Sequence, residues 1–373
     1  MRVRFPPPAP VEIQSMSYPL IILGAGASFG SLEIDRQPPF DREILTKWKP
    51  PLTNQLFDTS RFISIIKNYK DVALLASEIT NIVESGQPFD FEQHLSDLET
   101  QFAAQTFSQL IALRFYLAEL LGQVSCHFYR EVNHHCHLIN EINKRVGHAV
   151  VVNFNYDTLF EKNLKNINES NSIDKYVSGN IKVVKIHGAH NWRYAPKNDY
   201  RNVDAYEFFI SGGQALMNEY KTYELHPITT GNINYDSPYD LNKYYKEFQK
   251  SDGFIGTSSW KYYLPAIALP IASKGNFICP LSHIEILKKE LETVDRILVV
   301  GWKAQDEYLL QLLKEHLKQP TSVTVVSENE DVGNTIALKF RGIPHIADEN
   351  IYISKGRGYK DFMVSRGYEI FFS

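Results

Sequence analysis

Four apolar runs, each ending in glycine or in polar side chains, constrain the fold of this chain most. They lie in PLIILGAGASFG from Pro19, AVVVNFNYDTLFEKNL from Ala149, VVKIHG from Val183 and RILVVGWKAQDEYLLQLL from Arg296. Short, continuous apolar runs are typical of strands buried on both faces of a parallel sheet. The carboxyl ends of such strands meet at one edge, where doubly wound sheets bind their ligands. The pattern predicts an α/β fold, a Rossmann-like parallel sheet, with a dinucleotide site at that edge.

A large helical insertion is expected between the first and second of these strands, over about residues 54–145. Its clearest stretch runs from Leu110 to Phe128, where apolar residues recur at three- and four-residue spacing on one face. This block carries more apolar helix face than a small sheet can cover, so we expect it to supply contacts in a homo-oligomer.

The remaining segments are assigned from composition and short patterns. Residues 1–18 are rich in proline and predict a flexible N-terminal arm, whereas residues 19–373 are expected to form one domain. Residues 195–262 are rich in Tyr, Asn, Asp and Gly and predict a loop-rich excursion, with a helix at Asp240–Lys250. Short apolar runs near the C-terminus predict strands, at Ile351–Ile353 and Tyr368–Phe372.

Charge and cysteine usage exclude several classes of protein. The 373 residues carry a formal net charge of −4, which gives no overall attraction to nucleic acid. Three cysteines form no disulfide framework, so a reducing compartment, the cytoplasm, is expected. No apolar stretch approaches the length of a membrane span.

The first strand is followed by Gly24-Ala25-Gly26 and then by Ser28. Glycines after a strand let backbone amides approach a pyrophosphate, and a following helix favours its negative charge. The spacing is not a complete GxGxxG fingerprint. A tight turn between strand and helix, without any ligand, explains the same residues.

Asn155 and Asp157 follow the second strand, and two polar residues two apart in extended chain point the same way. They are candidates for ligand contacts at the sheet edge. Capping of the next helix is the alternative, because Asn and Asp are favoured at that position.

His187 ends the third strand and is followed by Gly188. Its imidazole titrates near neutral pH, which makes it a candidate general base, although most histidines at strand ends are structural. Lys182 and Lys185 are three apart on this strand and so point to opposite faces. We expect both to be solvated charges at the strand end.

A cluster of cysteine and histidine lies near the end of the helical block, and its spacing fits no standard zinc signature. Its members are Cys126, His127, His134, His135, Cys136 and His137. We expect residues of a helix and a polar turn here, and no metal site.

Taken together, GAGAS, NYD, HG and a later strand ending in glycine resemble the sirtuin family and its bacterial sirtuin-like branch. The segments PPLTNQLF and DFEQHLSDLE also look like the bacterial branch. The matching motifs cover well under half of the chain. The two CxxC pairs of deacylating sirtuins are missing, so the resemblance implies a domain without zinc and does not favour protein deacylation.

The resemblance implies a role for each matching position. Gly24, Ala25, Gly26 and Ser28 would hold the pyrophosphate and its flanks. Asn155 would contact the nicotinamide ribose and the attacking water, Asp157 the carboxamide, and His187 would be the base. A last group would line the adenosine side, namely Gly301, Ser327 and Glu328.

For the whole protein, the resemblance implies an NAD+ glycohydrolase that depletes NAD+ in bacterial antiphage defence. It also implies a possible partner of the HerA type, a hexameric ATPase. The alternative is a non-catalytic module that binds NAD+ or ADP-ribose and signals to a partner protein, and residual protein deacylation is a third hypothesis. The retention of both Asn155 and His187 favours catalysis.

Overall fold

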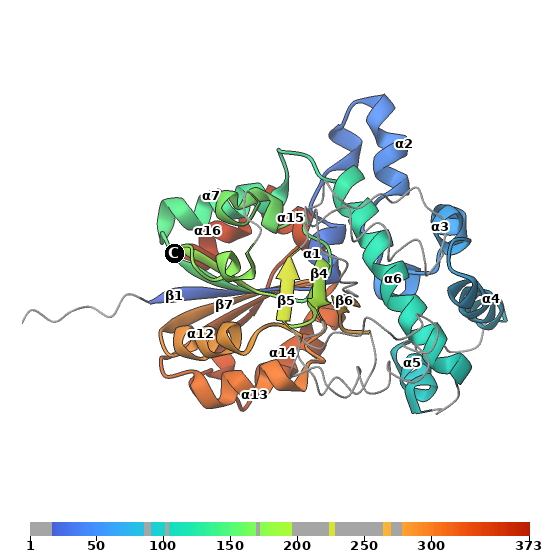
Figure 1. Ribbon diagram of the computed structural model, residues 1–373. Helices are drawn as coiled ribbons and strands as arrows, with labels where there is room; N and C mark the ends of the chain where they lie inside the picture. Colours follow the sequence, from blue (N-terminus) through green and yellow to red (C-terminus); the bar gives the residue numbers. More distant parts are fainter. Residues whose placement is uncertain are drawn as a thin grey trace, which may run out of the picture.

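A six-stranded parallel sheet forms the centre of the molecule (Figure 1). The computed structural model describes residues 17–85, 91–100, 104–168, 172–195, 224–227, 264–269 and 278–373. The strand order is β3-β2-β1-β7-β8-β9, and every neighbouring pair is parallel. The strands are β1 (Tyr18–Leu23), β2 (Ala149–Asn153), β3 (Ile181–Val184), β7 (Val294–Val300), β8 (Ser322–Val326) and β9 (Ile351–Ile353). The predicted Rossmann-like fold is therefore confirmed, as is the strand at Ile351–Ile353.

The strand order reverses beside β1. From β1 the chain builds outward to β2 and β3, and it then crosses to β7 on the other side of β1. The connections that leave β1 and β7 run in opposite directions, and open α/β sheets bind ligands at such a point. The topology thus places the glycine turn after β1 at the position where a ligand is expected.

Helices cover both faces of the sheet (Figure 1). One face carries α7 (His134–Arg145), α15 (Gly358–Val364) and α16 (Gly367–Phe372), and the other carries α12 (Leu281–Leu291), α13 (Glu307–His316) and α14 (Glu330–Phe340). The core between these layers is apolar, and the side chains of β1 from Leu20 to Leu23 are fully buried.

The prediction of a strand at Tyr368–Phe372 is wrong, because these residues form α16. Tyr368, Phe371 and Phe372 are buried, while Ile370 is 82% exposed. Burial at positions one, four and five of the run follows the helical period and not the alternation of a strand. The sequence of five residues was too short to distinguish the two periods.

The helical insertion packs around a second hydrophobic core, to which Leu159 and Ile267 also contribute. It comprises α3 (Thr59–Ile66), α4 (Lys70–Glu84), α5 (Phe91–Thr100) and α6 (Ala104–His127), and the shorter α1 (Ala25–Phe29) and α2 (Pro39–Lys47) precede it. The apolar face predicted on α6, from Leu110 to Phe128, is buried throughout. Among the described helices, none is both long and apolar enough to cross a membrane.

Self-association through the helical insertion stays a prediction. Apolar side chains remain exposed on the insertion, among them Leu74 at 58% and Ile63 at 41%. We expect the protein to be oligomeric at micromolar concentration, because covering such side chains is favourable. Light scattering on the purified chain is the measurement, with the double variant Ile63→Ser/Leu74→Ser as a comparison. A single monomeric species for the unmodified protein would contradict the prediction.

A small antiparallel sheet follows β3 directly. It consists of β4 (Gly188–Ala195) between β5 (Glu224–Pro227) and β6 (Leu264–Ile267). Gly188 has a φ of +78°, and a Cβ there would lie 1.9 Å from the carbonyl oxygen of Ala266, so only glycine fits. The strand β5 lies inside the excursion predicted over residues 195–262, and the helix predicted at Asp240–Lys250 lies outside the described residues.

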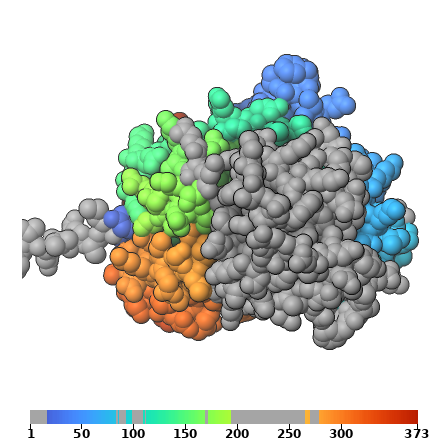
Figure 2. Space-filling view, viewed as in Figure 1, coloured from blue at the N-terminus to red at the C-terminus, as the bar shows by residue number. Residues whose placement is uncertain are grey.

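The space-filling view shows how the described parts meet at the surface. The green residues that precede β4 and the orange residues of the C-terminal half lie against each other on the left of the view (Figure 2). The blue residues of the N-terminal helices lie at its upper and right margins.

Candidate functional site

The glycine turn after β1 is packed directly against the chain that leaves β7. The amide of Gly24 donates to the carbonyl oxygen of Val300 at 2.9 Å, and that of Gly26 to the carbonyl oxygen of Gly301 at 3.2 Å. A Cβ on Gly24 would lie 2.4 Å from the carbonyl oxygen of Gly301, and a Cβ on Gly301 would lie 2.4 Å from the Cα of Gly26. Backbone packing therefore explains these glycines, and Ala25 begins the short helix α1. A role for the turn in binding a ligand remains a proposal.

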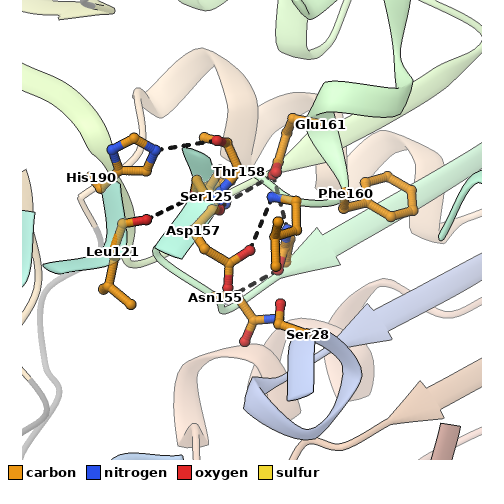
Figure 3. Close-up of polar contacts among 12 residues, drawn as sticks. Ser28, Leu121, Ser125, Asn155, Asp157, Thr158, Phe160, Glu161 and His190 are labelled. Atoms are coloured by element: carbon orange, nitrogen blue, oxygen red, sulfur yellow. Dashed lines mark hydrogen bonds and ion pairs between the residues drawn. The ribbon is translucent and has the colours of Figure 1, made fainter. Parts of the chain in front are cut away.

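Asn155 joins the end of β2 to the glycine turn. Its Nδ2 donates to the carbonyl oxygen of Gly24 and to the Oγ of Ser28, both at 2.9 Å (Figure 3). Its backbone amide donates to the Oδ1 of Asn153 at 3.0 Å. Asn155 and Ser28 are both buried. The hydrogen bonds fix the orientation of the Asn155 amide at the carboxyl edge of the sheet, beside the predicted pyrophosphate residues.

Asp157 holds its own backbone turn. Its Oδ1 accepts a hydrogen bond from the amide of Leu159 at 3.0 Å, which is the local bond that Asp favours in turns. The next helical segments along the chain are a short 3-10 turn, Glu161–Asn163, and then α8 (Lys165–Asn168). The capping alternative for Asp157 is thus realised as a turn, and contact with a carboxamide remains a proposal.

Lys185 is fully buried, so the expectation of a solvated charge at this position is wrong. Its Nζ donates to the Oε1 of Glu161 and to the carbonyl oxygen of Asp157, both at 2.8 Å. The same Oε1 accepts a hydrogen bond from the Nδ2 of Asn153 at 2.9 Å. Burial raises the pKa of Glu161, and the neighbouring Lys185 ammonium opposes that shift.

The buried ion pair is part of the support for Asn155. Glu161 accepts a hydrogen bond from the side chain of Asn153, and the Oδ1 of Asn153 in turn accepts one from the backbone amide of Asn155. Figure 3 shows Glu161 and Asn155 in this group of polar contacts. Lys182, by contrast, is only partly buried and pairs with Glu290 near the start of the strand.

His187 lies beside a carboxylate that comes from the opposite side of the switch point. Its Nε2 is 3.0 Å from the Oδ2 of Asp306, and both side chains are buried. The Oδ1 of Asp306 accepts the amide of Leu309 at 2.8 Å and so caps α13. The carbonyl oxygen of His187 accepts from the amide of Ala268 at 2.9 Å. Both the backbone and the ring of His187 are therefore held in place.

Aromatic side chains lie around this histidine, among them Tyr156, whose ring centroid is 6.4 Å from that of His187. The ring of Phe154 packs edge-on to His187 with centroids 5.0 Å apart, and it stacks on Trp302 at 5.1 Å. Trp302 follows Gly301 in the connection from β7 to α13. That connection therefore makes three contacts at the site. Its Gly301 packs against the glycine turn, its Trp302 stacks on Phe154, and its Asp306 faces His187.

The residues predicted for the adenosine side lie further along the sheet. Ser327 follows β8 and is buried, with its Oγ donating to the carbonyl oxygen of Asn329 at 2.7 Å, whereas Glu328 is exposed. Gly301 lies between the two groups, since its amide donates to Val326 at 3.3 Å and its Cα touches the glycine turn. The structure thus brings Gly24, Gly26, Ser28, Asn155 and Gly301 together directly. Ser327 and Glu328 share only the sheet edge with them.

The cysteine and histidine cluster does not converge on one point. Cys126 is exposed near the end of α6, Cys136 lies on α7, and His135 is buried against Phe160 and Tyr359. Burial lowers the pKa of His135 to about 3, which keeps it neutral. Within the described part of the chain, no three His, Cys, Asp or Glu side chains are arranged to hold a metal ion.

We expect the purified protein to contain no stoichiometric zinc. The physical reason is the lack of paired CxxC ligands, which structural zinc sites of this kind require. Elemental analysis by mass spectrometry, after dialysis without chelator, measures it. About one zinc per chain would contradict the prediction, and a Cys126→Ser/Cys136→Ser variant would then show whether this cluster holds it.

Sequence reasoning missed Asp306, Trp302 and the buried role of Lys185. Asp306 had a usable signal, since it lies just after the strand that neighbours β1 and directly before a helix pattern. A carboxylate at that place falls on the same edge as His187. No feature of the sequence indicated that Lys185 is buried, because a lysine is rarely buried unless an opposite charge pairs with it.

The similarities of this chain to known proteins are distant. No protein-family model and no curated protein sequence matches the chain. Among solved structures, a mutant Sir2 homologue in complex with 2'-O-acetyl ADP ribose aligns over 95% of this chain and 91% of its own, with 12% identity and a TM-score of 0.39. A Sir2 homologue in complex with NAD aligns over 95% and 90%, with 10% identity and a TM-score of 0.37. Sir2Tm bound to a propionylated peptide aligns over 95% and 94%, with 13% identity and a TM-score of 0.36. At these values no residue role is transferred to this chain.

Proposed function

We propose that the protein is an NAD+ glycohydrolase, which cleaves NAD+ to ADP-ribose and nicotinamide. One observation carries the proposal. Asn155, hydrogen-bonded to the glycine turn, follows the end of β2, and His187, paired with Asp306, follows the end of β3. Both therefore lie at the carboxyl edge of the sheet, on the same side of β1. An amide and a base, both held by hydrogen bonds at one edge of the sheet, are the groups that hydrolysis of a nucleotide glycosidic bond needs.

The chemistry assigns a role to each residue. Water attacks C1′ of the nicotinamide ribose, the C1′–N bond breaks, and nicotinamide leaves as a neutral base with the bonding electrons. His187 takes the proton that the water loses, and Asn155 orients the ribose and the water. Gly24, Ala25, Gly26 and Ser28 hold the pyrophosphate, and Asp157 contacts the carboxamide. Gly301, Ser327 and Glu328 line the adenosine side, where an acidic side chain can accept from a ribose hydroxyl.

In the cell, we propose that this activity depletes NAD+ as the effector of a bacterial antiphage defence system. The support is the resemblance of the motifs GAGAS, NYD and HG to the bacterial sirtuin-like branch. Such a protein is restrained until infection, and a HerA-type ATPase is the proposed partner that releases the restraint. Co-purification of the two proteins, with NAD+ cleavage compared in the presence and absence of the partner, tests this part of the proposal.

Release of nicotinamide from NAD+ by the purified protein is the direct test of the activity. We expect nicotinamide and ADP-ribose in equal amounts, measured by chromatography, with and without the candidate partner. Binding of NAD+ by calorimetry without any release of nicotinamide would replace the proposal by the non-catalytic binding module. Products that require an acylated peptide would instead indicate deacylation.

A further inference from the structure

We infer that Asp306 is a positioning residue that sets the proton-bearing nitrogen of His187 and raises its basicity. This inference rests on the proposed function only for its consequence in NAD+ cleavage. The effect on the histidine ring itself follows from the geometry of the two side chains. Asp306 lies in the segment that begins at Arg296, but the sequence motifs predict no role for it.

The side chains of Asp306 and His187 are in direct contact. The Oδ2 of Asp306 is 3.0 Å from the Nε2 of His187, within hydrogen-bond distance, and both side chains are buried. A carboxylate only accepts hydrogen bonds, so a neutral His187 carries its proton on Nε2 and its lone pair on Nδ1. A buried carboxylate also stabilises the imidazolium that forms when the ring takes a proton.

The carboxylate of Asp306 is held in a fixed orientation by the helix that it caps. Asp306 is the N-cap of α13, and its Oδ1 accepts from the amide of Leu309 at 2.8 Å. One oxygen is thus committed to the helix, which presents the other oxygen to His187. The helix cap and the histidine contact use different oxygens of one side chain, so the orientation of the ring is fixed by secondary structure.

Aromatic side chains pack against the imidazole ring of His187 as well. Phe154 packs edge-on to the imidazole at 5.0 Å, and the Phe154 ring is itself stacked on Trp302. These aromatic contacts restrict the ring but do not choose between its two nitrogens. Asp306 does distinguish them, because its carboxylate lies against Nε2.

The test uses Asp306→Asn, which keeps the helix cap and removes the charge. Asn is as good an N-cap as Asp, so its Oδ1 accepts from Leu309 and its Nδ2 faces His187. The Asn amide donates, so it forces Nε2 of the histidine to accept and moves the ring proton to Nδ1. Asp58→Asn is the matched control, because Asp58 caps α3 by accepting from the amide of Ser60 at 3.0 Å.

Nitrogen NMR of the histidine rings reads the effect without any need for activity. The signal of His187 among the 12 histidines is assigned by its loss in His187→Gln. We expect the ring proton on Nε2 in the unmodified protein and on Nδ1 in Asp306→Asn, with a protonation midpoint lower by about 1–3 pH units. Asp58→Asn is expected to change neither. The same proton position and the same midpoint in Asp306→Asn and the unmodified protein would overturn the inference.

Nicotinamide release then separates this inference from the proposed function. We expect Asp306→Asn to slow NAD+ cleavage by roughly 10²–10⁴-fold, as loss of the correct histidine tautomer does in hydrolytic triads. Cleavage at the unmodified rate in Asp306→Asn would overturn the positioning role and leave the glycohydrolase intact. If the unmodified protein cleaves nothing but the NMR signals change as expected, the glycohydrolase fails and the control of His187 by Asp306 stands. Should Asp306→Asn not fold, Asp306→Ser keeps a capping oxygen and is expected to lower the protonation midpoint in the same direction.

Discussion

Replacement of His187 or Asn155 by alanine is expected to slow NAD+ cleavage by about 100- to 10,000-fold. Loss of His187 removes the proposed base, and general-base assistance is typically worth this much. Loss of Asn155 removes the amide that orients the ribose and the water, and a preorganised polar group contributes a comparable factor. The measurement is the rate of nicotinamide release at saturating NAD+, under conditions in which the unmodified protein is active.

Matched controls separate chemistry from folding. Asn155→Ala also breaks two hydrogen bonds to Gly24 and Ser28, which costs roughly 1–3 kcal/mol of stability, so thermal melting accompanies each rate. Asn166→Ala removes an exposed side-chain amide of α8, and His316→Ala truncates the side chain of the last residue of α13. Both controls are expected to cleave NAD+ at the unmodified rate. Unmodified rates in His187→Ala and Asn155→Ala as well would show that these residues are not the site.

Replacement of Lys185 by methionine is expected to lower the free energy of unfolding by about 3–5 kcal/mol. The change removes the ammonium and leaves the Glu161 carboxylate buried without its counter-charge. An uncompensated buried charge strongly destabilises the folded state. The loss is expected to shrink as the pH falls, because burial raises the pKa of Glu161 and a protonated side chain carries no buried charge. Urea unfolding at pH 7 and at pH 5 measures both effects.

Two further variants test the physical reason for this loss. Lys185→Met/Glu161→Gln removes both charges while an oxygen remains for Asn153, so it is expected to regain most of the lost stability. Lys182→Met breaks the partly exposed pair with Glu290, and it is expected to cost no more than about 1 kcal/mol. Equal losses for Lys185→Met and Lys182→Met would mean that burial of the charge is not the cause.

The sequence by itself determined the sheet and the place of the site along the chain. Each of the four apolar runs is a strand of the predicted parallel type, except that β3 ends at Val184, before Lys185 and His187. Such information is local: an unbroken apolar run identifies a strand buried on both faces, and the residues after it must lie at the edge of the sheet. For the same reason Gly24, Asn155 and His187 could be predicted at one edge from the sequence alone.

The tertiary structure alone decided which side chains meet at that edge. His187 and Asp306 are 119 residues apart, and only the crossing from β3 to β7 brings them to 3.0 Å. The burial of Lys185 depends in the same way on Glu161 in the neighbouring connection, since a lysine loses its water only where a carboxylate replaces it. Residues 368–372 form a helix because a helix, and not a strand, turns Tyr368, Phe371 and Phe372 onto the core together. Local patterns carry no information about such distant partners, and these partners fix the protonation, the burial and the final orientation of the side chains.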